Sequence, residues 1–197
     1  MIQPLRLVAL DLSLTATGIA VTHDQVGEPR LACRTITPRK RPTRTAIDHE
    51  RLHETFGAIA AAVQCKPDLV IVEWLPQFTG HGDAALRLAE LHGAIKHWLF
   101  SQKLTYVDVR PVHLKQYATG KGNATKQDVR EAVTARYGRL LHIHTEDEAD
   151  AVALLMAGLD AYGSRLPDGQ DLPVVPLVNR KAVTATTWPE LEIGAVS

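Results

Sequence analysis

Hydrophobic positions along the chain predict strands and helices in a regular order. Short apolar runs bounded by turn residues indicate strands, whereas apolar residues repeated at helical spacing indicate helices. The expected strands lie at residues 5–12, 18–23, 30–37, 69–74 and 104–109. The expected helices lie at residues 46–64, 83–102, 111–120, 125–137 and 146–162.

The connections between these elements predict how the strands pair. The first three strands are joined by short turns and should be antiparallel, whereas strands joined through a helix should be parallel. We therefore expect an α/β fold, a mixed five-stranded sheet with three antiparallel strands and then parallel ones, flanked by helices. Residues 1–162 should form this single domain. Residues 163–197 carry four prolines without a hydrophobic period, so we expect a peripheral tail, loosely packed or dependent on a partner.

Composition narrows the class of protein. The chain has 197 residues, of which 45% are hydrophobic, and no apolar run approaches the ~20 residues that span a bilayer. The N-terminal residues lack the layout of a signal peptide and are typical of a strand. Two cysteines, Cys33 and Cys65, are too few for a disulfide framework. We therefore expect a cytoplasmic protein with no membrane partner.

Charge is segregated along the chain although it sums to zero, with 22 basic and 22 acidic residues. Residues 110–139 contain seven basic and two acidic residues, and residues 37–45 contain four basic residues and no acid. Such segregation is typical either of solvated surface or of surface that meets phosphates.

Two acidic residues interrupt otherwise apolar strands. Asp11 lies near the end of the first strand, and Glu73 lies near the end of the fourth. Each alone is most often a strand-end residue that reaches solvent, since a buried unpaired charge is costly. Two such acids on strands that could be neighbours favour a site for a hard divalent cation, Mg²⁺ or Mn²⁺.

The start of the last predicted helix is also rich in acids, at residues 146–150. Thr145 and Glu148 have the spacing of a capping box, which explains some of this charge. Asp147 and Asp150 are three residues apart, and Glu146 and Asp150 are four apart, so either pair could share one helix face. Helix geometry alone does not choose between these pairs.

These motifs together resemble the RuvC family of Holliday-junction resolvases, which belong to the RNase H-like superfold. The resemblance covers about residues 5–160 and rests on the segments 7-LVALDLSLTATGIAV-21, 70-VIVEW-74, 114-LKQYATGKGNATKQDVREAV-133 and 147-DEADAVAL-154. The acidic pattern is shared by many RNase H-like nucleases, and the 114–133 segment makes the resemblance more specific. It implies a crossover junction endodeoxyribonuclease that cuts four-way DNA by paired nicks, leaving 5′-phosphate and 3′-hydroxyl ends.

The resemblance also implies a set of site residues. It selects Asp147 and Asp150 on the helix, so that Asp11, Glu73, Asp147 and Asp150 would hold two Mg²⁺ or Mn²⁺ ions about 3.5–4 Å apart. Lys126 would offset the charge that develops on the phosphate. The expected DNA-binding residues are Lys115, Lys121, Lys126, Arg130, Arg39, Lys40, Arg41 and Phe78.

Members of the family act as homodimers, and the helix at 83–102 matches their dimer helix. The chain departs from the family at Leu12-Ser13, where Pro-Gly is usual, and at the residues after Glu73, where Phe78 or Trp74 would have to stack on bases. The tail after residue 163 has no counterpart. These departures would suit a divergent, phage-type lineage and bear on substrate choice more than on chemistry.

Three other functions are compatible with parts of the sequence. The same acids would serve a nuclease selective for flaps or forks, and a resolvase-like protein could bind junctions without cutting. An actin-like phosphotransferase also has an acid and hydroxyl residues after its first strand, but it needs a second related domain. Residues 119–123 (TGKGN) do not form a Walker A motif, so no nucleotide cofactor is expected.

Overall fold

The computed structural model describes residues 4–38, 49–75 and 83–191. Its centre is one five-stranded sheet in the order β3-β2-β1-β4-β5. The strands are β1 (Leu7–Asp11), β2 (Thr17–His23), β3 (Pro29–Ile36), β4 (Leu69–Glu73) and β5 (Tyr106–Val109). β1 pairs antiparallel with β2, and β2 pairs antiparallel with β3. β1 pairs parallel with β4, and β4 pairs parallel with β5. The mixed sheet predicted from the connections is confirmed.

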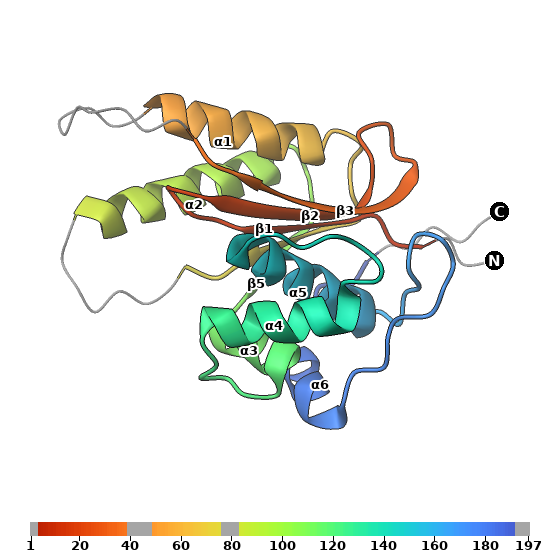
Figure 1. Cartoon of the computed structure of the whole chain (residues 1–197). Helices are drawn as coiled ribbons and strands as arrows, with labels where there is room; N and C mark the ends of the chain where they lie inside the picture. The colour runs from red at the N-terminus through yellow and green to blue at the C-terminus, as the bar shows by residue number, and fades with distance from the viewer. Residues whose placement is uncertain (1–3, 39–48, 76–82, 192–197) are drawn as a thin grey trace.

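Helices cover both faces of this sheet (Figure 1). One face carries α1 (His49–Ala62) and α2 (Asp83–Ser101), whose apolar side chains pack with Val8, Leu10 and their neighbours. The other face carries α3 (Pro111–Thr119), α4 (Lys126–Tyr137) and α5 (Glu146–Ala161). No helix in the described ranges is long and apolar enough to cross a membrane.

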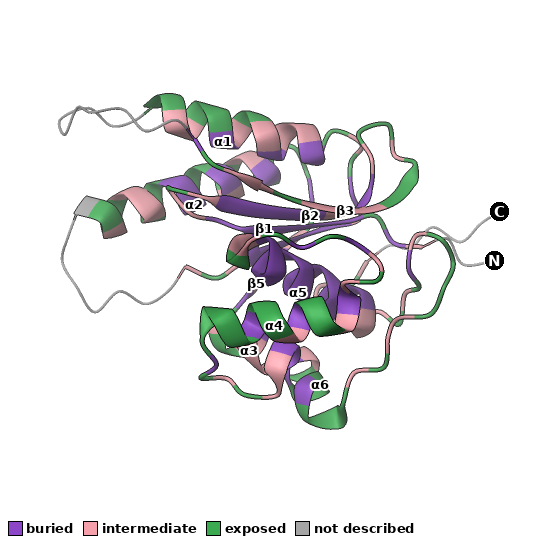
Figure 2. Ribbon diagram, in the orientation of Figure 1, coloured by how far each residue is buried: buried purple, intermediate pink, exposed green. Residues whose placement is uncertain are grey.

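α5 is the helix on which the site depends, because it is almost completely enclosed. Figure 2 shows it buried between the sheet and α4, whereas the outer side of α4 is exposed. Twelve consecutive residues, Glu148–Leu159, are buried. Tyr117 of α3 donates from its hydroxyl to the carbonyl oxygen of Met156 at 3.0 Å, which fixes the two helices together. The enclosure gives the acidic first turn of α5 one fixed position.

Gly18 permits the close approach of α5 to the sheet. It lies on β2, paired with Asp11 of β1. A Cβ atom at this position would lie 2.0 Å from the carbonyl oxygen of Asp147, a distance that no packing allows. The glycine therefore lets the first turn of α5 pack directly on the strand beside Asp11.

We expect Gly18→Ala to destabilise the protein by at least about 2 kcal/mol, because overpacking against a fixed backbone cannot be relieved by a rotamer change. Chemical denaturation measures this loss. Gly57→Ala is the control, since a Cβ atom there meets nothing within 4 Å and a helical alanine is favoured over glycine. Equal stability of the parent and Gly18→Ala would contradict the packing described.

The segment after residue 162 differs from its prediction. It forms an additional helix, α6 (Leu177–Thr184), which packs on α3. Asn179 and Ala182 are buried there, and Leu166 joins the main core. The loose packing expected of this tail is therefore wrong for residues 163–191. The sequence pattern missed α6 because the helix is short and one of its two buried residues is polar. The division of the chain at residue 162 remains a prediction.

Candidate active site

The acidic site lies where β1, β4 and α5 meet. Asp11 ends β1 and Glu73 ends β4, and both strands run in the same direction. The N-terminal part of α5 adds Asp147 and Asp150. Asp11 is only 4% exposed and Asp150 only 5%, so these carboxylates are not ordinary surface charges.

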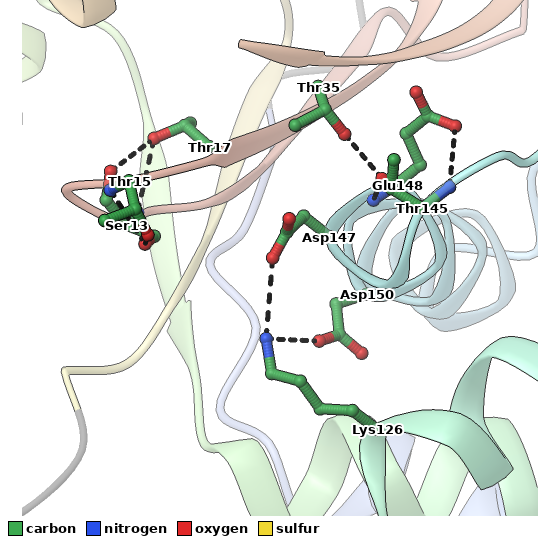
Figure 3. A network of polar contacts seen from close by, with 9 residues as sticks. All are labelled: Ser13, Thr15, Thr17, Thr35, Lys126, Thr145, Asp147, Glu148 and Asp150. Carbon is green, nitrogen blue, oxygen red and sulfur yellow. Dashed lines mark hydrogen bonds and ion pairs between the residues drawn. The ribbon is translucent and has the colours of Figure 1, made fainter. Parts of the chain in front are cut away.

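Lys126 supplies a positive charge to these acids from the first turn of α4. Its Nζ lies 3.5 Å from Oδ1 of Asp147 and 3.5 Å from Oδ2 of Asp150. Figure 3 shows the lysine side chain reaching from α4 toward the two aspartates. The three residues come from helices that pack on each other, α4 and α5. The contact therefore joins the basic segment 110–139 to the acidic start of α5.

The acids raise one another's proton affinity. Burial, and then the adjacent charge of Glu73, hold the pKa of Asp11 well above its usual range. Burial also raises the pKa of Glu73, and Asp150 adds to this, although a hydrogen bond from Asp11 acts in the opposite direction. Burial and the charge of Asp11 raise the pKa of Asp150 to about 7. The site therefore contains more negative charge than its surroundings neutralise.

The same acids raise the pKa of Lys126. Partial burial acts to lower its pKa, but the charges of Asp11, Asp150 and Asp147 outweigh this effect and raise it. The ammonium group is therefore held in its charged form.

The acids at the start of α5 have different surroundings and different roles. Glu148 caps the helix: its Oε2 accepts from the amide of His144 at 2.6 Å, while its own amide donates to Oγ1 of Thr145 at 3.0 Å. The predicted capping box is confirmed. Glu146 is exposed to solvent. The structure thus brings Asp147, rather than Glu146, to Lys126 together with Asp150, and so distinguishes the two pairs that helix geometry left open.

The turn after Asp11 is held by hydroxyl groups. Thr17 donates from Oγ1 to the carbonyl oxygen of Ser13 at 2.9 Å and accepts from the amide of Ser13 at 3.2 Å. Oγ of Ser13 and Oγ1 of Thr15 are 3.2 Å apart (Figure 3). These contacts order the turn at Leu12-Ser13.

The donor chemistry of the site fits a hard divalent cation. Oδ2 of Asp11 is buried and has no hydrogen-bond partner within the part of the chain that the structure describes. Carboxylate oxygens are preferred ligands of Mg²⁺ and Mn²⁺. In the described ranges no three acidic, histidine or cysteine side chains converge as closely as metal ligands do. The carboxylates of Asp147 and Asp150 instead both contact the ammonium group of Lys126.

The expected DNA-binding residues lie in several places. Lys115 on α3 is close enough to act on Glu73 electrostatically. Lys121, in the turn between α3 and α4, is exposed, as is Arg130 one turn beyond Lys126 on α4. The remaining residues predicted to bind DNA lie outside the described residues: Arg39, Lys40, Arg41 and Phe78.

Sequence reasoning missed Gly18, although a glycine inside a strand is a recognised sign of close backbone approach. It also missed Gln116, whose Nε2 donates to the carbonyl oxygens of Gly120 at 2.7 Å and Val178 at 2.8 Å. These bonds tie the turn that carries Lys121 to α6. No pattern in the sequence signals such a contact.

A mixed sheet of this order, with acids at the ends of its adjacent parallel strands β1 and β4 and on the helix packed across them, defines an RNase H-like domain of the nuclease type. The model of the family described as crossover junction endodeoxyribonuclease RuvC matches residues 7–157. The chain belongs to this family.

Similar proteins agree with this assignment. The chain is 24% identical over 165 residues to a RuvC of Carboxydothermus hydrogenoformans, covering 82% of this chain and 100% of that protein. It is 29% identical over 140 residues to a RuvC of Trichlorobacter lovleyi, covering 71% and 74% respectively. The structure of Thermus thermophilus RuvC in complex with a Holliday junction substrate has the same fold, with a TM-score of 0.59, 18% identity, and coverage of 86% of this chain and 99% of that one.

Proposed function

We propose that this chain is an endonuclease that resolves Holliday junctions by paired nicks. The observation that carries the proposal is that the charges of Asp11, Glu73, Asp147 and Asp150 all act on Lys126 at one end of the sheet, in a member of the RuvC family. Junction DNA is the substrate class because the relatives are named crossover junction endodeoxyribonucleases, and one solved relative holds a Holliday junction.

The four acids are proposed to bind two Mg²⁺ or Mn²⁺ ions. Bound metal would activate water and stabilise the leaving oxygen, so that hydrolysis gives 5′-phosphate and 3′-hydroxyl ends. Asp11 and Glu73 would hold the metal from the rigid strand ends, and Asp147 and Asp150 from the enclosed helix. Lys126 would hold its proton and present positive charge to the scissile phosphate.

Basic residues around the acids would hold the rest of the DNA. Lys115 acts electrostatically on Glu73, and Lys121 and Arg130 are exposed on the turn before α4 and on α4. Arg39, Lys40, Arg41 and Phe78 are proposed to contact DNA on the sequence resemblance alone. Phosphate contacts of this kind make binding strongly dependent on salt.

A homodimer would place two active sites on one junction. α2 supplies a candidate interface, because Leu86 and Phe100 are 67% and 73% exposed. They are fourteen residues apart, about four helical turns, and therefore share one face of the helix. The proposal is that this face meets its copy in a second chain, so that opposed strands are cut together.

Cleavage assays test the function directly. Purified protein with Mg²⁺ is given a labelled immobile four-way junction, a flap and a linear duplex of matched sequence. Symmetric paired nicks in the junction alone establish a resolvase. Preferential cutting of the flap keeps the site and changes the substrate. Tight junction binding with no metal-dependent cutting of any branched DNA would leave a binding protein.

Metal-free stability tests the charge of the site without an activity assay. Asp150 has a pKa of about 7 in the folded protein, against an ordinary 3.8, so its ionised form is disfavoured in the folded state. As pH rises from about 4 to above 7, ionisation of Asp150 therefore lowers the free energy of unfolding. At pH 8 without metal, Asp150→Asn should therefore raise the free energy of unfolding, by up to about 4 kcal/mol. The gain should shrink towards pH 4.

Thermal unfolding at both pH values, with and without Mg²⁺, measures this effect. Mg²⁺ should raise the Tm of the parent protein more than that of Asp150→Asn, because the variant has lost one ligand. Asp171→Asn is the control, since its side chain is 84% exposed and should leave stability within about 0.5 kcal/mol. A variant less stable than the parent at pH 8 would contradict the excess of negative charge.

A further inference from the structure

A cleft of 570 Å³ opens beside the acidic site, between the edge strand β5 and the C-terminal tail. One side is formed by residues that follow the two parallel strands, among them Trp74, Arg110 and His113. The other side is formed by the tail, including Thr186, Thr187 and Trp188. The family match ends at residue 157, so the tail wall lies outside the part shared with the family.

The cleft reaches the end of the sheet at which Glu73 lies, because Trp74 and Arg110 follow the ends of β4 and β5. Trp74 directly follows Glu73, and its amide donates to the carbonyl oxygen of Val109 at 2.7 Å, extending the pairing of β4 and β5 by one bond. Arg110 comes next on the neighbouring strand and is exposed. Glu73 and Trp74 point to opposite faces of the sheet, as successive strand residues do, and Lys96 of α2 lies over the Trp74 ring. A DNA strand bound at Glu73 would meet Trp74 and Arg110 where it continues past this end of the sheet.

The walls of the cleft are held in place. Lys96 lies 2.6 Å from Oδ1 of Asp108 and 5.5 Å from the centre of the Trp74 ring, so an ion pair fixes the cation that supports the indole. Nδ1 of His113 and Oγ1 of Thr186 form a 3.0 Å hydrogen bond across the cleft, which binds the tail to α3.

Further hydrogen bonds anchor the tail. Nε1 of Trp188 donates to the carbonyl oxygen of Val183 at 2.9 Å, and the hydroxyl of Tyr162 donates to that of Pro189 at 2.6 Å. The buried Asn179 donates to the carbonyl oxygen of Tyr117 at 2.8 Å. The cleft is thus a preformed feature, and no folding of the tail is needed to complete it.

We propose that this cleft binds an unpaired DNA strand next to the cleavage point, with the C-terminal tail as one wall. The inference rests on the proposed function. Trp74 is 45% exposed and offers an aromatic face, on which a base can stack only when it is not paired in a duplex. Arg110 supplies the charge that a phosphate requires, and the hydroxyl of Thr187 supplies a hydrogen-bonding group.

The test uses two closely matched variants of the tail. Thr187→Glu adds a negative charge to the cleft wall, and Thr184→Glu adds the same charge at an exposed residue of α6 outside the cleft. Both positions are exposed, so both variants should fold. Binding is measured by fluorescence anisotropy in EDTA, with a labelled oligodeoxythymidine and a labelled four-way junction as probes.

Thr187→Glu should weaken binding of both probes about tenfold, because like charges are brought together, and Thr184→Glu should stay within about twofold. Arg110→Ala should lower the slope of log affinity against log salt by about 1. Arg165→Ala should leave it unchanged, because Arg165 lies in the segment after α5, outside the cleft, and pairs with Asp171. Trp74→Ala should weaken oligodeoxythymidine binding at least about fivefold, and Trp74→Phe should restore most of it.

The parent protein separates the two hypotheses. If it binds and cuts junctions while Thr187→Glu and Arg110→Ala bind both probes like the parent, the cleft proposal is wrong and the proposed function stands. If the parent neither binds nor cuts branched DNA, the proposed function fails and the cleft proposal falls with it.

Discussion

Asp147→Asn is expected to reduce junction cleavage in Mg²⁺ by at least about 1000-fold, because loss of a metal ligand removes several kcal/mol of transition-state stabilisation. The asparagine has nearly the same shape and keeps the first turn of α5 intact, since capping depends on Thr145 and Glu148 instead. Binding of the junction in EDTA should be unchanged or slightly tighter, because one negative charge has been removed. Single-turnover cleavage and anisotropy measure the two effects separately.

Glu146→Gln is the matched control for this prediction. Glu146 is the adjacent residue on the same helix turn and carries the same charge, but it is exposed and takes no part in the cluster around Lys126. We expect its cleavage rate to stay within about twofold of the parent. If Glu146→Gln lost activity while Asp147→Asn retained it, the proposed ligand set would be shifted by one residue and the pairing of Asp147 with Asp150 would be wrong.

Lys126→Ala is expected to lower the cleavage rate about 100- to 1000-fold, the cost of removing one preorganised charge from a transition state. The lysine also lies 3.5 Å from both Asp147 and Asp150, so its removal leaves the buried acids less neutralised. The metal-free variant should therefore have a lower Tm than the parent at pH 8, and Mg²⁺ should recover much of the difference. Lys126→Arg should retain part of the activity.

Lys121→Ala provides the comparison that assigns the effect to Lys126. Lys121 is exposed in the turn before α4, so its loss should lower DNA affinity and reduce the salt slope by about 1 while the rate at saturating DNA stays the same. Identical behaviour of the two lysine variants, with both affecting affinity alone, would show that Lys126 acts only as a phosphate contact.

The sheet could be predicted from the sequence because β1 and β4 are continuous apolar runs that end in an acid. Such runs suit central strands, and an acid at the end of each indicates that the strands reach the same edge. The antiparallel and parallel orientations followed from the short and long connections, whereas the order of the strands in the sheet came from the structure. Local patterns were sufficient here because burial on both faces leaves a strong hydrophobic signal.

The site was less accessible to sequence reasoning, because spacing along a helix allowed both Asp147 and Glu146 to pair with Asp150. The choice depends on how α5 is rotated against the sheet, and Gly18 permits the rotation that brings the backbone of Asp147 onto the strand. The tail was also unpredictable, since α6 buries Asn179 through a bond to the backbone of Tyr117. Such polar anchoring gives no hydrophobic period.

The position of Lys126 also bears on the order in which the protein meets its ligands. An empty cluster of four carboxylates would repel the DNA backbone until a cation arrived, so metal would have to bind first. Here the ammonium group that contacts Asp147 and Asp150, together with the raised proton affinity of Asp11, reduces that repulsion in advance. If the proposed function holds, we therefore expect junction and metal to associate in either order, so that recognition of branched DNA is separable in time from the commitment to cut it.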